Sequence, residues 1–517
     1  MRIIIRYVAL LCMVINGFAQ VTDQSHILRL ALANQQFNWD PQAIENTDEL
    51  LLFSTVYQGL VQLDAKTLQP LPALAESWSI SEDGLQYTFT LRSRLYFSDG
   101  TPITAESFYR SILRLLDPLM NNPNAELIYM ITNAKEYALG AEISAQDVGV
   151  SIIDARTIQF NLAYPAPYFF EVLAHPALSP LSGSQLPMKW QEPRSIPFSG
   201  PYLYAGTTEN GFTLRRNRLY WNAEQVNITT IDVQLFDSEA ESNDVIRREE
   251  IDWAHNFFNP KEPIHTAHRL VVNQRYASQY FTFIAESGPY AQQDIRKALI
   301  MLLPLQLLRD SGLPVATTLV PSTQDYSVVS RFRSDYSEGM LLLSKAGYPE
   351  GEGLPPLVIQ AFHPEDPRIL VMQESWQNAG IQVEIYSPDD HNHYYEVDPI
   401  HETTIMESAW SADYLDPLAF LFMWQSDSRY NNTNFRDQYF DELIDNSHRL
   451  LGRERLEALA MAEQYLLESG VVIPMNFLVD LELISPFMFM EFGYNPLGRQ
   501  RFEQLTKRIS YIYHNAI

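Results

Sequence analysis

Residues 70–108 read PLPALAESWSISEDGLQYTFTLRSRLYFSDGTPITAESF, and this stretch combines the signals of a β-strand, a turn and a helix. Polar and apolar residues alternate through 86–92, which predicts a strand with one buried face. That strand would bury Tyr87, Phe89 and Leu91. Within 104–118 we expect a helix that begins after Thr104 and ends before Pro118. Strand and helix signals follow each other closely, so we predict a mixed α/β fold, that is, α+β elements in one chain.

The same mixture continues along the rest of the chain. Residues 157–162 alternate like a second strand, and 453–470 have helical spacing with Gly470 as the expected C-cap. The Gly- and Pro-rich loop 347–356 separates a predicted helix from a predicted strand. The sequence has no internal repeat and no long flexible linker, which favours lobes packed together over domains on a tether.

The composition is that of a folded, acidic protein. The chain has 517 residues, of which 46% are hydrophobic and 12% aromatic, and a disordered chain has fewer aromatic residues. This length is enough for roughly two to four domains or lobes. The net charge of −27 argues against nucleic-acid binding and against an anionic membrane surface. It fits a soluble protein with a mild preference for neutral or cationic ligands.

The N-terminal segment 1–19, MRIIIRYVALLCMVINGFA, has the pattern of a secretory signal peptide. A basic start precedes an apolar run, and Gly17 and Ala19 are the small residues expected before a cut at Gln20. The alternative is a lipoprotein anchored through Cys12, but a leucine precedes that cysteine where a small residue is needed. No later run of about eighteen apolar residues follows, so we expect no membrane-spanning helix. Without Cys12 the mature chain would have no cysteine, and therefore no disulfide and no thiol catalyst.

The sequence lacks the common catalytic motifs. We find no nucleophile elbow, no zinc-binding H-E-x-x-H, no P-loop and no dinucleotide-binding glycine pattern. His391 and His393, beside Asp389 and Asp390, could hold a metal, although an acidic, aromatic loop is the commoner interpretation. We therefore predict a protein that is not an enzyme and that has no cofactor and no metal. A secreted carbohydrate-active enzyme is the alternative from another class, because so many acidic residues always offer some carboxylate pair.

A set of ordered motifs, covering about residues 30–500, resembles the extracellular solute-binding proteins of the oligopeptide and dipeptide family (family 5), especially its oligopeptide-binding branch. The motifs are NWDP (38–41), VYQGLV (56–61), AESW (75–78), DG (83–84), F-x-L-R (89–92), SDG (98–100), TA (104–105), AYPAPYFFEVLAHPALSP (163–180), RRNRLYWN (215–222), EEIDW (249–253), DIRKAL (294–299), WSADYLDPLAF (410–420), NNTNFRDQYFDELI (431–444) and ELISP (482–486). Most of these residues identify the fold and not the ligand. We expect Trp78, Phe89, Leu91 and Gly100 in the core and in turns.

The resemblance implies a periplasmic receptor of an ATP-driven (ABC) importer, with a peptide ligand and with permease and ATPase subunits as partners. Such a receptor has two lobes that close around a ligand cleft, plus an extra third domain, and a monomer that binds no nucleic acid is expected. The boundaries that we predict are a signal peptide at 1–19, lobe I at 20–57, extra domain II at 58–183, lobe I again at 184–271, lobe III at 272–490 and a return to lobe I at 491–517.

The stretch WSADYLDP (410–417) holds the site that the resemblance implies. In peptide-binding members, the aspartate that matches Asp413 pairs with the free α-ammonium of the peptide, and Trp410 and Ser411 are expected to line the cleft beside it. The physical reason is that an ammonium buried in a closed cleft needs a fixed counter-charge. The alternative is that Asp413 only caps a loop, as we expect for Asp416 before its proline.

The sequence departs from the family at the other end of the ligand. Glu407 stands where oligopeptide receptors have an arginine, and Asp398 loosely replaces a second arginine. Asn124 falls at the position of a cleft tyrosine, while Glu45 matches a cleft acid of the family. Two acids at basic positions would repel the C-terminal carboxylate of a short peptide. The ligand would then be longer than a tripeptide, basic, or not a standard peptide, unless the alignment is shifted and other basic residues take over.

Other functions stay open at this point. The same fold could serve a non-peptide solute such as an oligosaccharide, an opine or a metal complex. A sensory or chaperone-like peptide binder, uncoupled from import, is a further alternative.

Overall fold

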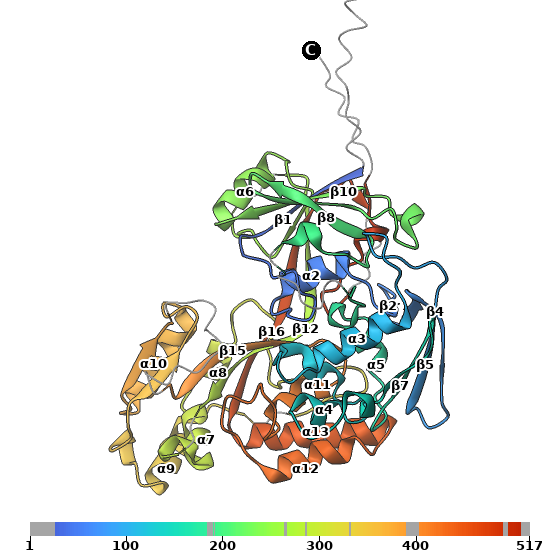
Figure 1. The fold of residues 1–517 in the computed structure, drawn as a ribbon. Coiled ribbons are helices and arrows are strands. Elements are labelled where there is room, and N and C mark those ends of the chain that lie inside the picture. Colours follow the sequence, from blue (N-terminus) through green and yellow to red (C-terminus); the bar gives the residue numbers. More distant parts are fainter. Residues whose placement is uncertain are drawn as a thin grey trace, which may run out of the picture.

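The computed structural model of the chain describes residues 26–183, 190, 192–262, 266–284, 287–329, 332–388, 403–489 and 495–507. The predicted signal peptide (1–19), which contains Cys12, lies outside these ranges, and so does Gln20 at the predicted cut. Asp398 and the pair His391 and His393 also lie outside them. The described ranges form an upper lobe and a larger lower part, joined by long strands (Figure 1). The fold is a mixed α/β fold, as predicted.

Lobe I, the upper part of Figure 1, is built on the N-terminal strand. Strand β1 (Ile27–Ala33) runs parallel to β10 (Thr230–Phe236) and to β11 (Trp253–His255). Strands β9 (Gly211–Arg216) and β8 (Tyr202–Thr208) extend the sheet in antiparallel fashion. Helix α2 (Thr47–Val56) follows β1, and the described part of lobe I also includes α6 (Glu239–Arg247). Its core contains the buried rings of Trp39, Phe53, Phe198, Tyr202 and Trp253.

The segment 58–183, predicted as domain II and called so below, contains residues 70–108. Its four-stranded sheet has the order β4-β5-β7-β6, made of β4 (Ala75–Ile80), β5 (Gln86–Leu91), β7 (Thr157–Asn161) and β6 (Val150–Asp154). Tyr87, Phe89 and Leu91 of β5 are buried as predicted, and so are Ile158 and Phe160, the alternate residues of β7, which confirms both strand predictions. Helix α3 (Ala105–Leu115) has Thr104 as its N-cap and ends before Pro118, as predicted. The remaining described elements of the domain are β2 (Val61–Leu63), β3 (Pro70–Pro72), η2 (Pro123–Ile128), α4 (Ala134–Ala138), η3 (Ala145–Asp147), α5 (Phe169–Leu173) and η4 (Pro176–Leu178).

Lobe III shares one sheet with lobe I. The ten-stranded sheet has the order β14-β13-β15-β12-β16-β11-β1-β10-β9-β8. The two long strands β12 (Arg269–Phe283) and β16 (Val472–Ile484) pass from one lobe into the other, and their pairing is irregular between Gln274 and Ser278. The predicted boundary at residue 272 therefore falls inside a continuous strand. The sheet continues in lobe III with β15 (Ile405–Ser411), β13 (Leu357–Gln360) and β14 (Val383–Tyr386).

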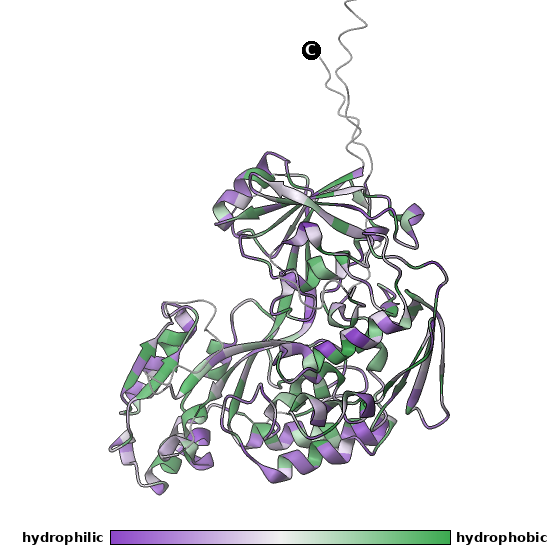
Figure 2. Ribbon diagram, viewed as in Figure 1, coloured by the Kyte–Doolittle hydropathy of each residue, from purple (hydrophilic) through white to green (hydrophobic). Residues whose placement is uncertain are grey.

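Helices surround the lobe III end of this sheet. They are α7 (Gln293–Met301), α8 (Leu305–Leu308), α9 (Tyr336–Lys345), α10 (Pro367–Asn378), α11 (Leu418–Leu421), α12 (Gln438–Ser447) and α13 (Gly452–Glu468). Helix α13 corresponds to the helix predicted at 453–470, but its C-cap is Ser469, and Gly470 follows in a left-handed conformation with φ of 68°. The outer helices carry both hydrophilic and hydrophobic residues, as expected of helices with one buried face (Figure 2).

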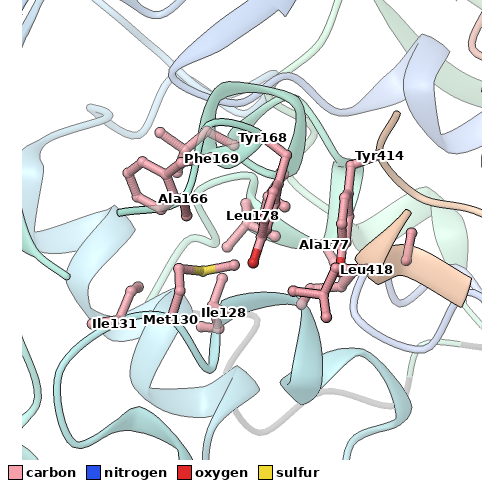
Figure 3. Packing of buried hydrophobic residues seen from close by; sticks show 14 of the residues in the cluster. Ile128, Met130, Ile131, Ala166, Tyr168, Phe169, Ala177, Leu178, Tyr414 and Leu418 are labelled. Carbon is pink, nitrogen blue, oxygen red and sulfur yellow. The ribbon is translucent and has the colours of Figure 1, made fainter. Parts of the chain in front are cut away.

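One apolar core joins domain II to the α11–α13 side of lobe III. Figure 3 shows Tyr168 and Leu178 of domain II packed with Tyr414 and Leu418 of lobe III. The rings of Tyr168 and Tyr414 stack with centroids 4.3 Å apart and an interplanar angle of 13°. Lobe I and the α7–α10 part of lobe III have cores of their own. In the described ranges, no helix is both long and apolar enough to cross a membrane.

Candidate functional site

The candidate site lies where parallel strands of the two lobes end. In lobe I, β1, β10 and β11 run parallel, and α2 follows the carboxyl end of β1. In lobe III, β13 runs parallel to β14 and β15, and α10 follows β13. Ligands of open α/β sheets bind in the crevice outside the carboxyl ends of such strands. Asp413, just past the end of β15, is therefore placed at a binding edge of lobe III.

Asp413 is held by a histidine that the sequence analysis did not identify as a functional residue. His175 Nε2 lies 3.4 Å from Asp413 Oδ1. The other ring nitrogen, Nδ1, is 3.2 Å from the backbone nitrogen of Ala177 and accepts its N–H. Burial lowers the pKa of His175, so the ring is neutral and carries its proton on Nε2, which donates to the carboxylate. His175 had been quoted only within a fold motif, because a histidine before a proline has no specific ligand signal.

Two arginines add positive charge around Asp413. Arg499 donates to the backbone carbonyl of Asp413, and also to the carbonyl of Glu171 at 2.9 Å. Arg275 lies against the backbone of Gly498, where a Cβ would come within 2.8 Å of its guanidinium. Burial would raise the pKa of Asp413, but the hydrogen bond from His175 and the charges of Arg499 and Arg275 outweigh it and lower the pKa. The Asp413 side chain is 27% exposed, so an ionised carboxylate is presented at this edge.

Trp410 and Ser411 precede Asp413 on β15 and are half-buried. The Trp410 indole Nε1–H donates to the carbonyl of Ala419 at 2.7 Å, which fixes the ring over α11. The ring also meets Tyr430 edge-on, with centroids 5.0 Å apart. Ser411 is the last residue of β15 and pairs with Ala277 of β12. Trp410 and Ser411 are the last two residues of β15, where successive side chains point to opposite faces, and Asp413 follows two residues after the strand ends.

Glu407 is buried within a polar cluster of lobe III. Its Oε1 accepts from Gln279 Nε2 at 2.9 Å and lies 3.4 Å from Arg368 Nη2, while its Oε2 accepts the Phe362 N–H at 3.2 Å. Arg368 also pairs with Asp366 at 2.7 Å. Burial raises the pKa of Glu407. The acid that was expected to repel a carboxylate thus lies beside an arginine, which the spacing in the sequence did not reveal.

Asn124 lies on η2 of domain II and contacts lobe I, and Glu45 lies in lobe I just before α2. Asn124 is buried, and its amide nitrogen donates to the carbonyls of Gln42 at 2.9 Å and Ile44 at 3.2 Å. The side-chain nitrogen is therefore committed to the protein, and it ties domain II to the loop before α2. Glu45 is the next residue of that loop and is exposed. Its backbone N–H donates to Glu49 Oε2 at 3.0 Å.

Asp416 has a larger structural role than a turn residue. Its Oδ1 accepts the Leu418 N–H at 3.0 Å, in keeping with the turn that was predicted. It also forms a buried ion pair with Arg455 of α13, at 2.6 Å from Oδ2 and 2.9 Å from Oδ1. This pair fixes the loop after Asp413 to lobe III.

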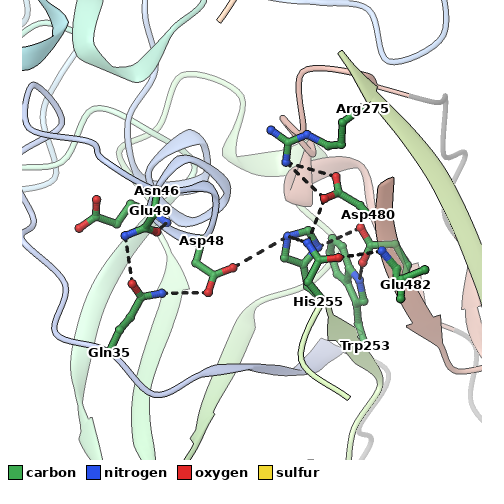
Figure 4. A network of polar contacts seen from close by, with 11 residues as sticks. Gln35, Asn46, Asp48, Glu49, Trp253, His255, Arg275, Asp480 and Glu482 are labelled. Atoms are coloured by element: carbon green, nitrogen blue, oxygen red, sulfur yellow. Dashed lines mark hydrogen bonds and ion pairs between the residues drawn. The ribbon is translucent and has the colours of Figure 1, made fainter. Parts of the chain in front are cut away.

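A polar network lies at the carboxyl end of β11 in lobe I (Figure 4). His255 Nδ1 is 2.9 Å from Glu482 Oε1, and its Nε2 is 3.9 Å from Asp48 Oδ1 at the start of α2. Burial would lower the pKa of His255, but the carboxylates of Glu482, Asp480 and Asp48 outweigh it and raise the pKa to about 9. On β16, Asp480 also pairs with Arg275, at 3.3 Å. The network thus joins α2 to the two strands that cross between the lobes.

The described residues contain no group of three or more His, Cys, Asp or Glu side chains that could hold a metal ion. The histidine pair considered in the sequence analysis lies outside these residues.

Comparison with known proteins places the chain among solute-binding proteins. The profile of the bacterial extracellular solute-binding proteins, family 5 Middle, matches residues 69–432. The periplasmic oligopeptide-binding protein OppA of Salmonella typhimurium is 27% identical over 506 residues, covering 92% of each chain. A probable deoxycholate-binding periplasmic protein of Escherichia coli is 25% identical over 473 residues, covering 87% of each chain. The crystal structure of a periplasmic oligopeptide-binding protein from Borrelia burgdorferi superposes with a TM-score of 0.83 at 25% identity, covering 93% of this chain and 100% of that one.

Proposed function

Because the chain belongs to family 5 of the bacterial extracellular solute-binding proteins, we propose that it is the substrate-binding receptor of an ABC importer that takes up peptides. The peptide lies in the cleft between lobes I and III, and the closed receptor delivers it to the permease and ATPase subunits. Closure is a ligand-driven shift between two arrangements of the lobes about β12 and β16.

The environment of Asp413 carries this proposal. The carboxylate is ionised, partly exposed and oriented by a neutral histidine, so it offers a free negative charge to a cationic group. The α-ammonium of a peptide supplies that charge together with three hydrogen-bond donors. Trp410 packs beside it as an apolar wall. Main-chain groups near the end of β15, on the edge away from β12, can pair with the peptide backbone like an added strand.

The far end of the ligand meets the cluster of Arg368, Asp366 and Glu407. Arg368 offers a cation to a C-terminal carboxylate, while its two acidic neighbours weaken that attraction. We therefore infer that peptides longer than a tripeptide, or peptides with a basic residue at this position, bind better than short acidic ones.

The location and the remaining properties belong to the same proposal. The receptor is exported through its N-terminal segment, acts in the periplasm as a monomer and catalyses no reaction. The relatives in Salmonella typhimurium and Escherichia coli are described as periplasmic binding proteins, which supports this proposal.

Native mass spectrometry of the purified receptor tests the peptide class directly. We expect added masses that form a ladder of amino-acid residue differences and that disappear after partial unfolding and dialysis. The stripped protein should then rebind a mixture of synthetic tri- to hexapeptides. If no peptide adduct forms in either experiment, the peptide proposal is wrong.

A non-peptide solute is the second candidate, because the 25% identical Escherichia coli relative is named as a probable deoxycholate-binding protein. In that case a bile acid or another small solute would be retained in place of the peptide ladder. The same spectra distinguish the two candidates.

A further inference from the structure

Domain II is tied firmly to lobe I by buried polar contacts. The Arg114 guanidinium of α3 forms an ion pair with Asp40 at 2.5 Å, and both side chains are buried. Gln42 Nε2 donates to the Ser111 carbonyl at 2.8 Å, and Asn124 donates back to the Gln42 carbonyl. The chain also passes twice between the two units, before β2 and after η4. Lobe III is joined to lobe I mainly through β12 and β16, and it meets domain II across the apolar core that contains Tyr168 and Tyr414. A rotation about these strands would have to part that core as well as the polar contacts at its edge.

Two short segments face each other where that parting would occur. Residues 121–126 of domain II and residues 427–430 of lobe III together form what we call the clasp. Arg429 Nη1 donates to the carbonyl of Asn122 at 2.7 Å and to that of Asn121 at 3.2 Å. The Tyr430 hydroxyl donates to the carbonyl of Pro123 at 2.5 Å.

The acid of the clasp is held from the lobe III side. The Arg429 backbone N–H donates to Glu126 Oε1 at 3.0 Å, and the Ser428 hydroxyl lies 3.2 Å from Glu126 Oε2. An ion pair of 2.7 Å between Lys135 and Asp427 lies at its solvent side. Burial raises the pKa of Glu126, so the closed clasp shields a carboxyl group that water would otherwise solvate.

The clasp contacts both halves of the candidate cleft. Tyr430 packs edge-on against Trp410, with ring centroids 5.0 Å apart, and therefore contacts the strand that leads to Asp413. Asn124, the residue after Pro123, holds the carbonyls of the loop that leads to Glu45. A ligand that orders Trp410 would therefore also order Tyr430, which closes onto domain II.

The clasp is built to part as well as to close. Its hydrogen bonds join backbone carbonyls to long side chains. After opening, both partners can form hydrogen bonds with water, so each bond adds little net stability. A small pocket, partly open to solvent, lies beside the contacts and is lined by residues of both segments. The clasp lies at the edge of the apolar core that joins the same two units, so its polar contacts and that core would open together.

We propose that residues 121–126 and 427–430 form a closure clasp. The clasp stabilises the closed arrangement of the receptor and couples ligand binding beside Trp410 to lobe closure. This inference rests on the proposed function, because it concerns regulation of the same cleft. The clasp lowers the free energy of the closed arrangement relative to the open one, so its loss should speed ligand release.

The test uses spin labels in a chain that begins at Gln20 and so has no cysteine of its own. Labels at Glu136→Cys and Glu442→Cys, two exposed positions on domain II and lobe III, report the separation of the two units. The clasp variant combines Tyr430→Phe with Arg429→Ala. Tyr430→Phe removes only the hydroxyl bond and keeps the ring against Trp410. The control is Arg453→Ala, which removes an arginine whose partner, Glu457, lies on the same helix of lobe III.

With a peptide identified in the wild type, we expect the clasp variant to bind it about tenfold more weakly, mainly through faster dissociation, which corresponds to about 1.4 kcal/mol. Its label distances should shift toward the longer, open population with and without peptide, while the control stays at wild-type values. Unchanged dissociation and unchanged distances in a folded clasp variant would overturn the clasp. A wild-type distance that is already as long as that of the variant in every condition would overturn it too. Failure of the wild type to bind any peptide would instead refute the proposed function, and the ligand-free distances would still test the clasp.

Discussion

Replacing Asp413 by Asn removes one charge and keeps the shape of the proposed amine anchor. A contact pair at about 4 Å is worth roughly 4 kcal/mol at an effective dielectric constant of about 20. The side chain is 27% exposed, and the nearby charges of Arg499 and Arg275 oppose an incoming ammonium, so the net loss should be smaller. We expect a loss of about 2–3 kcal/mol, which is roughly a 30- to 150-fold weaker Kd. The asparagine oxygen can still accept from His175, so the loop should stay in place.

Calorimetric titration of wild type and Asp413→Asn, each with a free and an N-acetylated peptide, completes the cycle. Acetylation removes the positive charge that Asp413 would pair with. It should therefore weaken binding to the wild type by about as much free energy as the substitution does, and weaken binding to the variant only a little. Asp445→Asn, an exposed change on α12, controls for the net charge of lobe III. An acetylation penalty in Asp413→Asn as large as in wild type would show that this carboxylate does not hold the amine.

Three further predictions concern stability. Burial raises the pKa of Glu463 to about 7, so its contribution to stability is full below its unfolded pKa of about 4.5 and is lost as the pH rises through 7. Between about pH 5 and pH 8, the free energy of unfolding measured in urea should therefore fall less with rising pH in Glu463→Gln than in wild type. Arg455→Met leaves the buried Asp416 carboxylate unpaired and should destabilise by about 3–5 kcal/mol in the same assay; the double variant with Asp416→Leu should recover part of this loss. Gly380 has φ of 83°, and a Cβ there would overlap the Glu350 carbonyl. Gly380→Ala should therefore lower the free energy of unfolding by at least about 1–3 kcal/mol and lower the urea midpoint. An unchanged midpoint would contradict that account.

The elements of domain II could be read from local patterns. The alternation of 86–92 became β5, and the capping signal at Thr104 became the start of α3, because both depend on neighbours within a few residues. The candidate role of Asp413 came instead from the resemblance of its stretch to a family motif, and the strand before it, β15, was not predicted. Such signals survive in a single sequence because each element must place its own apolar face toward a core.

The partners of the site residues could not be read in this way. His175 reaches Asp413 from 238 positions earlier in the chain, and Arg499 reaches it from 86 positions later. Arg368 reaches Glu407 from another element of lobe III, so an acid that looked repulsive in the sequence lies beside a cation. Asn124 donates its side-chain amide to two carbonyls of the loop before α2, some 80 positions earlier in the chain. None of these contacts leaves a trace in spacing or composition.

The sequence by itself determined the mixed α/β class, the strands β5 and β7 and the helices α3 and α13, since these depend on local periodicity and on capping signals. Only the tertiary structure decided which charges neutralise one another, which side of domain II meets lobe III, and that one sheet runs through both lobes. The physical reason is that electrostatic and packing energies depend on distances in space, and the fold brings together Asp413, His175 and Arg499 from three distant parts of the chain.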